Sequence, residues 1–206
     1  MKKLFLIAVL FLTSNNLYAQ NYLFFLHNMW IELNGTDVAH PEFGKAQYYE
    51  IIDKFKKQGL TVISELRPKG TNGNVYAVKV AKQVDSLLKK GVPASHITIA
   101  GTSKGGFITM FTSGILKNKD INYVLIGCCG EQSVSDDSVH LFGNVLSIYE
   151  ASDIWLSCQK TKAKPGNDVK HFKEIELHTG LKHGFLYRAM DEWILPASEW
   201  AKQNYK

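Results

Sequence analysis

The sequence predicts an α/β protein in which a mainly parallel, six-stranded sheet lies between two layers of helices, a three-layer α/β/α sandwich. Apolar runs of strand length alternate along the chain with segments in which apolar residues recur at helical spacing. The chain has 206 residues, of which 45% are hydrophobic and 21% charged, so it can bury a substantial core as a single domain. This composition excludes the disordered and fibrous classes.

The first nineteen residues differ from the rest of the chain and are predicted to be a secretory signal peptide. Two lysines, Lys2 and Lys3, precede an apolar run over residues 4–12, and Ala19 provides the small residue expected at the cleavage site. The apolar run is much shorter than the ~20 residues that a membrane-spanning helix needs. We therefore expect no stable membrane anchor, a periplasmic or secreted location, and a single mature domain over residues 20–206.

The charge of the mature chain is only mildly basic. Removal of the leader takes Lys2 and Lys3 with it and lowers the formal net charge from +5 to +3. The remaining lysines are scattered, which is typical of solvated helix faces and not of a nucleic-acid stripe. No group of His, Asp or Glu has the spacing of metal ligands. We predict no nucleic-acid partner, no metal and no other cofactor.

Three cysteines remain in the mature chain, Cys128, Cys129 and Cys158. An exported protein meets an oxidising compartment, so one disulfide and one buried thiol are the simplest arrangement. A bridge between neighbouring cysteines is strained, which favours a disulfide between Cys158 and either Cys128 or Cys129. Three buried free thiols are the alternative, because free cysteine often behaves as a small core residue.

The N-terminal half of the predicted domain contains two strands and two helices. The apolar run at residues 22–27 predicts a central strand that leads into a mobile connection. Residues 44–58 carry apolar side chains at helical spacing and are followed by Gly59, which predicts an amphipathic helix with a defined end. Residues 60–66 predict the second strand, and residues 75–90 predict the second helix after a glycine-containing loop.

The C-terminal half continues the alternation with four strands and three helices. The predicted strands are the run that begins at His96 and residues 122–127, 144–149 and 172–177, and the predicted helices are residues 103–117, 154–162 and 188–203. We expect the last helix to be interrupted near Pro196, because proline lacks the N–H that a helix interior uses. Strands that alternate with helices in this way favour a parallel sheet covered on both faces.

The segment Gly101-Thr102-Ser103-Lys104-Gly105 lies between a β-branched strand and a helix, and it predicts a sharp turn with Ser103 at its apex. A nucleophilic hydroxyl must be held clear of the sheet in a crowded turn, and glycines two residues before and after it relieve that crowding. In a parallel sheet, ligands gather at the carboxyl ends of the strands. Asp153 follows the fifth predicted strand and His183 the sixth, so serine, acid and histidine occur in the order of an α/β-hydrolase triad.

The sequence resembles a small member of the α/β-hydrolase superfamily. The resemblance extends over essentially all of the mature chain from Tyr22, and it is most specific at Gly101 to Gly105, Tyr149 to Asp153 and Lys182 to Phe185. It implies an α/β-hydrolase fold that lacks the first two strands of many relatives and has no insertion long enough for a large lid. We therefore expect a minimal, open core.

The resemblance implies Ser103 as the nucleophile and His183 as the general base and then the general acid. It implies Asp153 as the residue that orients His183 and stabilises its charged form. The alternatives are a helix cap for Ser103 and a surface position in a turn for His183. The alternatives for the acid are Glu150, Asp136 and Asp137.

The resemblance also implies an oxyanion hole formed by the backbone N–H of Lys104 and a second N–H from the loop after the first strand. That loop reads His27-Asn28-Met29, where many relatives have a His-Gly pair. Glycine permits unusual backbone angles there, and Asn is the other residue that tolerates them best. We therefore expect the N–H of Met29, with that of Asn28 next, to be the second donor.

Basic residues near the predicted site are candidates for substrate binding. His27, Arg67 and Lys69 lie on the loops after the first two strands, and Lys104 lies beside the predicted nucleophile. The cationic side chains could recognise a carboxylate or a phosphate on the substrate. A solvated loop is the alternative, and a pair between Glu32 and Arg67 would make both residues structural.

The predicted function is that of a secreted or periplasmic serine hydrolase that acts on a small ester, less readily an amide, through an acyl-enzyme. Two alternatives stay open. One is a hydrolase-fold binding or cell-envelope interaction protein without turnover, and the other is an acyl- or peptidyltransferase that uses the same residues. The expected partner is a small-molecule substrate.

Overall fold

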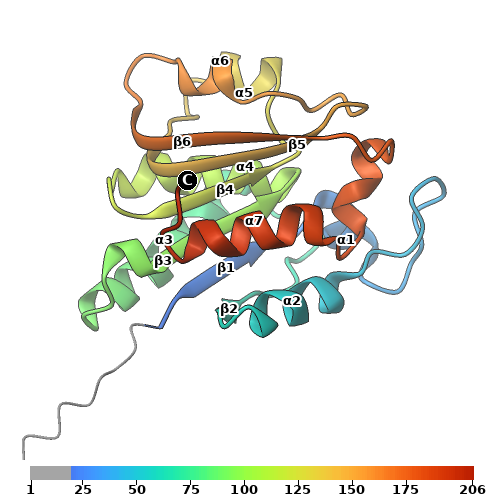
Figure 1. Cartoon of the computed structure of the whole chain (residues 1–206), viewed down its shortest axis with the longest axis horizontal. Helices are drawn as coiled ribbons and strands as arrows, with labels where there is room; N and C mark the ends of the chain where they lie inside the picture. The colour runs from blue at the N-terminus through green and yellow to red at the C-terminus, as the bar shows by residue number, and fades with distance from the viewer. Residues whose placement is uncertain (1–19) are drawn as a thin grey trace, which may run out of the picture.

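The structure is a computed structural model that describes residues 20–206, and the predicted signal peptide at residues 1–19 lies outside the described residues. Six parallel strands form one sheet in the order β2-β1-β3-β4-β5-β6 (Figure 1). They are β1 (Tyr22–Leu26), β2 (Thr61–Ile63), β3 (Ile97–Thr102), β4 (Asn122–Ile126), β5 (Phe142–Glu150) and β6 (Asp168–Leu177). The predicted α/β class with a six-stranded sheet is confirmed, and the sheet is wholly parallel.

Helices lie on both faces of this sheet (Figure 1). They are α1 (Met29–Asn34), α2 (Tyr48–Lys57), α3 (Gly73–Lys89), α4 (Lys104–Leu116), α5 (Glu131–Ser135), α6 (Gln159–Lys162) and α7 (Asp191–Ala201), with 3-10 segments η1 (Ala94–His96) and η2 (Lys182–Tyr187). Helices α2 and α7 pack on one face, and α3 and α4 pack on the other. The three-layer arrangement therefore agrees with the predicted fold class.

Side chains from the two faces of the strands form two separate cores. In β1, Leu23 and Phe25 belong to the core shared with α2 and α7. Phe24 and Leu26 belong to the core shared with α3 and α4. This period of two follows from the pleat of a strand, and burial on both faces explains the continuous apolar run in the sequence. Each buried side chain of this size stabilises the fold by roughly 1.5–3 kcal/mol.

The connection after β1 begins with a helix, so the prediction of a mobile connection is wrong there. Helix α1 spans six residues, Met29–Asn34, between Asn28 and Gly35. The side chain of Asn28 accepts the N–H of Ile31 at 3.1 Å, and Gly35 ends the helix with a φ of 78°. Asn and Gly are typical helix-start and helix-stop residues. The helix itself is too short to display the apolar periodicity that reveals longer ones.

The predicted helix at residues 154–162 is also wrong, because only Gln159–Lys162 is helical. Residues 151–158 form an irregular loop. Cys158 at its end is joined to Cys129 by a disulfide, and Leu156 forms a backbone bridge with the same Cys129. These tertiary contacts hold the loop against the connection after β4 and override the local helical pattern.

Several other details differ from the predictions; β6, for example, begins at Asp168 and not at residue 172. Helix α7 contains Pro196 without interruption, because Trp193 and Ala197 beside it are fully buried and their packing offsets one lost hydrogen bond. Strand β2 covers Thr61–Ile63 rather than residues 60–66. The next residue, Ser64, turns its hydroxyl to the carbonyl oxygen of Phe25 at 2.6 Å, and this side-chain hydrogen bond takes the place of the strand ladder.

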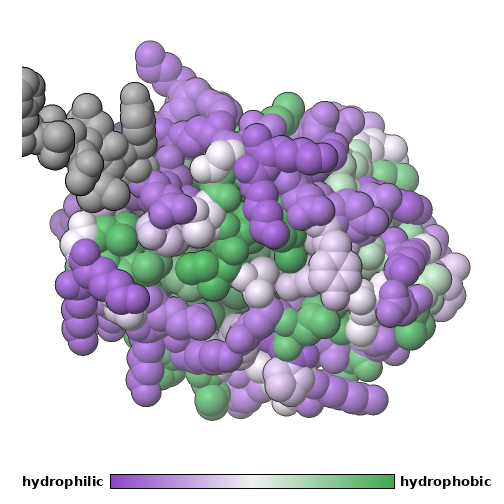
Figure 2. Space-filling model, turned by 90° about the horizontal axis from the view of Figure 1, so that it is seen from below, coloured by the Kyte–Doolittle hydropathy of each residue, from purple (hydrophilic) through white to green (hydrophobic). Residues whose placement is uncertain are grey.

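The surface of the molecule is mixed. Figure 2 shows one face on which hydrophilic residues prevail and apolar residues lie between them in small groups. Within residues 20–206 we find no helix that combines the length and the apolar character needed to cross a membrane.

Candidate active site

Ser103 lies at the apex of the turn between β3 and α4. Its φ of 50° and ψ of −118° are unusual for a residue with a side chain, and such a conformation stores roughly 1–3 kcal/mol of strain. A Cβ added at Gly105 would overlap the carbonyl oxygen of Leu26, and one added at Gly101 would overlap the carbonyl of Gly105. Both glycines are therefore required by the close approach of α4 to the strands, which leaves the Ser103 side chain at the end of β3.

Ser103, His183 and Asp153 come together from three separate loops. His183, in η2 after β6, has its Nε2 3.0 Å from Ser103 Oγ and its Nδ1 2.6 Å from Asp153 Oδ2. Asp153 is only 9% exposed, so its carboxylate is largely shielded from water. When Nδ1–H is donated to this carboxylate, the neutral imidazole presents an unprotonated Nε2 to the hydroxyl. The arrangement can therefore accept the proton of Ser103.

Glu150, the neighbouring alternative for the acid, lies in a different environment. Its carboxylate accepts the N–H of Thr179 at 2.9 Å, the hydroxyl of Thr179 at 2.6 Å and the N–H of Gly180 at 3.2 Å. Burial opposes ionisation of Glu150, but these hydrogen bonds outweigh it and hold its pKa below the ordinary value. Glu150 thus fastens the loop that carries His183, and the carboxylate in contact with the imidazole is that of Asp153. The other two alternatives, Asp136 and Asp137, lie in the connection after α5.

The two predicted N–H donors occupy equivalent positions in the fold. Lys104 is the first residue of α4, and Met29 is the first residue of α1. N–H groups in the first turn of a helix have no acceptor within that helix, so both can donate to an oxyanion. Gly105 packs directly on the backbone of His27, which brings the starts of the two helices together. Met29, Ser103 and Lys104 accordingly line one hollow.

Asn28 does not adopt the unusual backbone angles that we expected at this position. Its φ of −72° and ψ of 176° are extended, and its side chain caps α1. The reason that we gave for Asn at this position is therefore wrong. Asn28 contributes its side-chain oxygen, which caps the start of α1, and its ability to adopt unusual backbone angles is not used. The first helical position belongs to Met29, which leaves the N–H of Met29 as the better placed of the two candidate donors.

A buried network of charges lies beside the turn that carries Ser103. Glu32 of α1 accepts from Arg67 Nε at 3.1 Å and from Lys104 Nζ at 2.5 Å, and the side chains of Glu32 and Arg67 are completely buried. Thr71 donates its N–H to Glu32 at 3.1 Å, and its carbonyl accepts from Lys104 Nζ at 2.8 Å. Burial opposes ionisation of Glu32, but the two cations outweigh it and lower its pKa. The network joins the loops after β1, β2 and β3.

The substrate-binding role expected of His27 and Arg67 does not fit their positions. His27 is 0% exposed, and its Nε2 accepts the N–H of Arg67 at 2.9 Å while its Nδ1 donates to the carbonyl oxygen of Asn28 at 2.9 Å. Burial, together with the charge of Arg67, lowers the pKa of His27 to about 4. Arg67 forms an ion pair with Glu32, as in the alternative in which both residues are structural and do not bind substrate. Lys69 is exposed on the loop after β2 and does not line the hollow beside Ser103.

The disulfide joins Cys129 to Cys158, and Cys128 is a buried thiol. The sequence did not distinguish Cys128 from Cys129 as the disulfide partner of Cys158, and the packing explains why Cys129 is the partner. Cys128 belongs to the core beneath α4, where a Cβ at Gly106 would overlap its sulfur. Burial raises the pKa of the Cys128 thiol, so it stays protonated and inert.

The hollow beside Ser103 has a volume of about 250 Å³ and contains residues that the sequence reasoning missed. Its additional lining residues are Gly73, Phe107, Ile108, Phe111, Gln132 and Trp155. Phe107 and Phe111 lie four and eight residues after Ser103, so the helical spacing of α4 could have identified them. Trp155 could not be found in this way, because it belongs to the irregular loop that the disulfide shapes.

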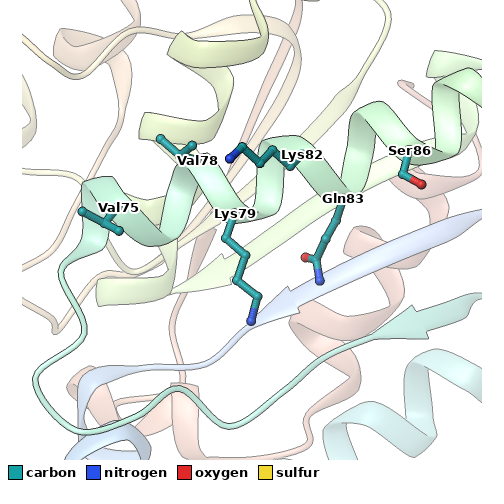
Figure 3. Close-up of a pocket in the computed structure, with 6 residues that line it drawn as sticks. All are labelled: Val75, Val78, Lys79, Lys82, Gln83 and Ser86. Atoms are coloured by element: carbon teal, nitrogen blue, oxygen red, sulfur yellow. The ribbon is translucent and has the colours of Figure 1, made fainter.

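Another hollow, of about 600 Å³, follows the exposed side of α3 (Figure 3). All the side chains that line it, Val75, Val78, Lys79, Lys82, Gln83 and Ser86, project from that one helix. Binding sites are formed by polar groups that converge from several elements, which this surface lacks. Among residues 20–206, no cluster of three or more His, Cys, Asp or Glu side chains is arranged to hold a metal ion.

No protein-family model matches the sequence, and no curated protein matches it. Solved structures do match the fold. Carboxyl esterase 2 from the mycorrhizal fungus Tuber melanosporum has a TM-score of 0.61 and 16% identity, over 89% of this chain and 78% of that one. SOBER1 of Arabidopsis thaliana has a TM-score of 0.55 and 12% identity, over 91% of this chain and 100% of that one. A fungal esterase from Rhizomucor miehei has a TM-score of 0.58 and 13% identity, over 91% and 76% respectively. The chain therefore has the α/β-hydrolase fold.

Proposed function

We propose that this protein of the α/β-hydrolase fold is a serine hydrolase that cleaves a small ester, and less readily an amide, through an acyl-enzyme. The observation that supports the proposal most directly is the chain of two short distances that runs from Ser103 Oγ to His183 Nε2, at 3.0 Å, and from His183 Nδ1 to Asp153, at 2.6 Å. A binding protein without turnover would have no need to keep these three side chains at hydrogen-bond distance from one another.

In the acylation step, Ser103 Oγ forms a bond to the carbonyl carbon of the substrate while its proton passes to His183 Nε2. The carbonyl π electrons move onto oxygen and give a tetrahedral oxyanion. When the oxyanion collapses, the bond from carbon to the leaving oxygen breaks, and His183 returns its proton to that oxygen. Asp153 stabilises the imidazolium that exists between the two proton transfers.

Deacylation repeats these steps with water. His183 removes a proton from water as the water oxygen bonds to the acyl carbon, and then returns that proton to Ser103 Oγ as the ester bond breaks. The products are a carboxylic acid and the regenerated enzyme. In both steps the N–H groups of Lys104 and Met29 donate to the oxyanion.

Export to the periplasm or the medium is part of the proposal. The leader-like segment at residues 1–19 supports it, as does the disulfide between Cys129 and Cys158. Disulfides persist in oxidising compartments and are rare in reducing ones.

The test combines covalent labelling with turnover. Purified protein should react with a fluorophosphonate at Ser103 and hydrolyse p-nitrophenyl acetate or butyrate. Ser103→Ala should abolish labelling and reduce kcat by about 10⁴-fold or more, because the whole triad acts through this oxygen. Ser86→Ala, on the exposed side of α3, is the matched control and should behave as wild type. Folded protein that shows neither labelling nor turnover, or a Ser103→Ala variant with full activity, would contradict the proposal.

A further inference from the structure

The hollow beside Ser103 adjoins a larger groove, and two residues line both of them. The groove has a volume of about 850 Å³ and runs along α5, the 151–158 loop and the start of α6. Gln132 and Trp155 line both the hollow and the groove. The two spaces therefore meet at this pair, of which Trp155 is much the larger side chain.

The chemistry of the proposed reaction assigns the hollow to one part of the ester. His183 must protonate the leaving oxygen, so the leaving group lies on the side of Ser103 that faces the imidazole. The hollow is lined by Ser103 and by both proposed oxyanion donors, Met29 and Lys104, but not by His183. The acyl group, which extends away from the leaving group, is the part that enters the hollow.

The lining of the hollow selects an apolar acyl group. Phe107, Ile108 and Phe111 of α4 form one wall, and Met29 and Trp155 contribute apolar side chains on the other sides. Lys104 is the only ionisable side chain in the lining, and its ammonium is bound to Glu32 and to the Thr71 carbonyl. A charged acyl group would lose its hydration there without gaining an opposite charge, and the amide of Gln132 is the one uncharged polar side chain besides Ser103 that the lining offers.

Trp155 is held in position from three directions. Its ring packs edge-on against Phe107 with the centroids 5.7 Å apart. A Cβ added at Gly130 would lie 3.4 Å from the Trp155 ring, so the backbone of Gly130 also packs closely against this ring. The disulfide from Cys158 and the bridge from Leu156, both to Cys129, fix the backbone on its C-terminal side.

We propose that the hollow is the acyl-binding site and that Trp155 closes it against the neighbouring groove, which makes the enzyme selective for short apolar acyl groups. The inference rests on the proposed esterase function. The hollow, at about 250 Å³, is smaller than the 300–1,000 Å³ typical of pockets for drug-sized ligands. With Trp155 removed, a longer chain can continue from the hollow into the groove.

The experiment compares kcat/KM for p-nitrophenyl acetate, butyrate, hexanoate and octanoate. Wild type should prefer acetate or butyrate to octanoate by about tenfold or more, because an acyl chain that exceeds its pocket loses roughly tenfold or more in kcat/KM. Trp155→Ala should raise the octanoate-to-acetate ratio by about tenfold and should move the optimum to longer chains. Trp155→Phe should lie between these two enzymes, since its smaller ring leaves only part of the passage open.

Tyr49→Ala is the matched control, because it removes an aromatic ring that is 58% exposed on α2, on the opposite face of the sheet. Its chain-length profile should equal that of wild type. If Trp155→Ala does not fold, Trp155→Leu provides the same comparison with less loss of packing. Turnover with the same profile in wild type and the Trp155 variants overturns this inference alone. A wild-type preference for octanoate also overturns it. Absence of ester turnover in wild type overturns the proposed function, and the inference with it.

Discussion

His27 is a buried histidine that stays neutral because burial disfavours its charged form, and because protonation of Nε2 would remove the hydrogen bond from the Arg67 N–H and place a charge near Arg67. Its pKa is lowered to about 4 from the ordinary 6.5. Between these values the unfolded chain binds a proton at His27 and the folded chain does not. A fall in pH therefore favours unfolding across this window, and the stability that depends on neutral His27 is complete above about pH 6.5.

We predict that the free energy of unfolding decreases by about 3 kcal/mol between pH 6.5 and pH 4 through this residue, at about 1.4 kcal/mol per pKa unit. The measurement is urea denaturation of wild type and His27→Gln over that range. The variant will be less stable at neutral pH but should have a flatter dependence on pH. His178→Gln, at an exposed position, should keep the wild-type slope. Parallel curves for wild type and His27→Gln would contradict the assignment.

At the level of elements, Glu32 connects three segments that are distant in the sequence. Helix α1, the loop after β2 and the start of α4 all meet at its carboxylate. The proposed donors Met29 and Lys104 belong to the first and last of these segments. In the proposed mechanism Glu32 is thus a positioning residue, which acts on the proposed oxyanion hole through the elements that it joins.

Glu32→Gln keeps the shape of the side chain but leaves the charges of Arg67 and Lys104 uncompensated. We expect a loss of roughly 3 kcal/mol in the free energy of unfolding. We also expect a fall in kcat with KM nearly unchanged, because the donors act mainly in the transition state. Glu65→Gln removes an exposed carboxylate paired with Lys79 and should change stability by less than about 1 kcal/mol. Equal effects of the two substitutions on kcat would argue against a positioning role.

The disulfide acts on a second group of elements. It spans 29 residues and fastens the 151–158 loop, which carries Asp153 and Trp155, to the segment after β4. Cross-links of this length stabilise a fold by about 3.5 kcal/mol, chiefly by restricting the unfolded chain.

We therefore predict that a double variant, Cys129→Ser with Cys158→Ser, loses about 3.5 kcal/mol of stability and shows faster amide hydrogen exchange in residues 151–158 than in β4. Cys128→Ser is the informative comparison, because it alters a buried cysteine without breaking the cross-link. Exchange that rises uniformly over the whole chain in the double variant would show that the bond has no local effect on the loop.

At the level of the whole molecule, the sheet and the order of the candidate site residues along the chain could be predicted, because they depend on local patterns. Continuous apolar runs such as Tyr22–Leu26 and Asn122–Ile126 are of strand length and favour strands buried on both faces. Ser103 is framed by glycines that the turn requires, and Asp153 and His183 each follow a strand. These features are all visible in short windows of sequence.

What could not be predicted depends on contacts between distant residues. The 151–158 loop is predicted to be helical in part, and its irregular course follows from contacts with distant residues, such as the links of Cys158 and Leu156 to Cys129. The burial of Arg67 depends on Glu32, which lies 35 residues earlier in the chain. The position of Trp155 beside Ser103 follows from that same loop. Each of these features depends on tertiary packing, which cannot be predicted from the spacing of residues within one segment.

The strand order has a consequence for the behaviour of the chain among its own copies. Strands β2 and β6 border the sheet, so each leaves one row of backbone groups without a strand partner. Such borders can template pairing with another molecule. Here β2 is only three residues long, and β6 carries Lys170, Lys173, Glu174 and Glu176. Shortness and charge are the means by which natural sheets prevent that pairing. The apolar, aggregation-prone segments of β1 and β4 are kept in the interior of the sheet, where each already has a neighbour on both sides.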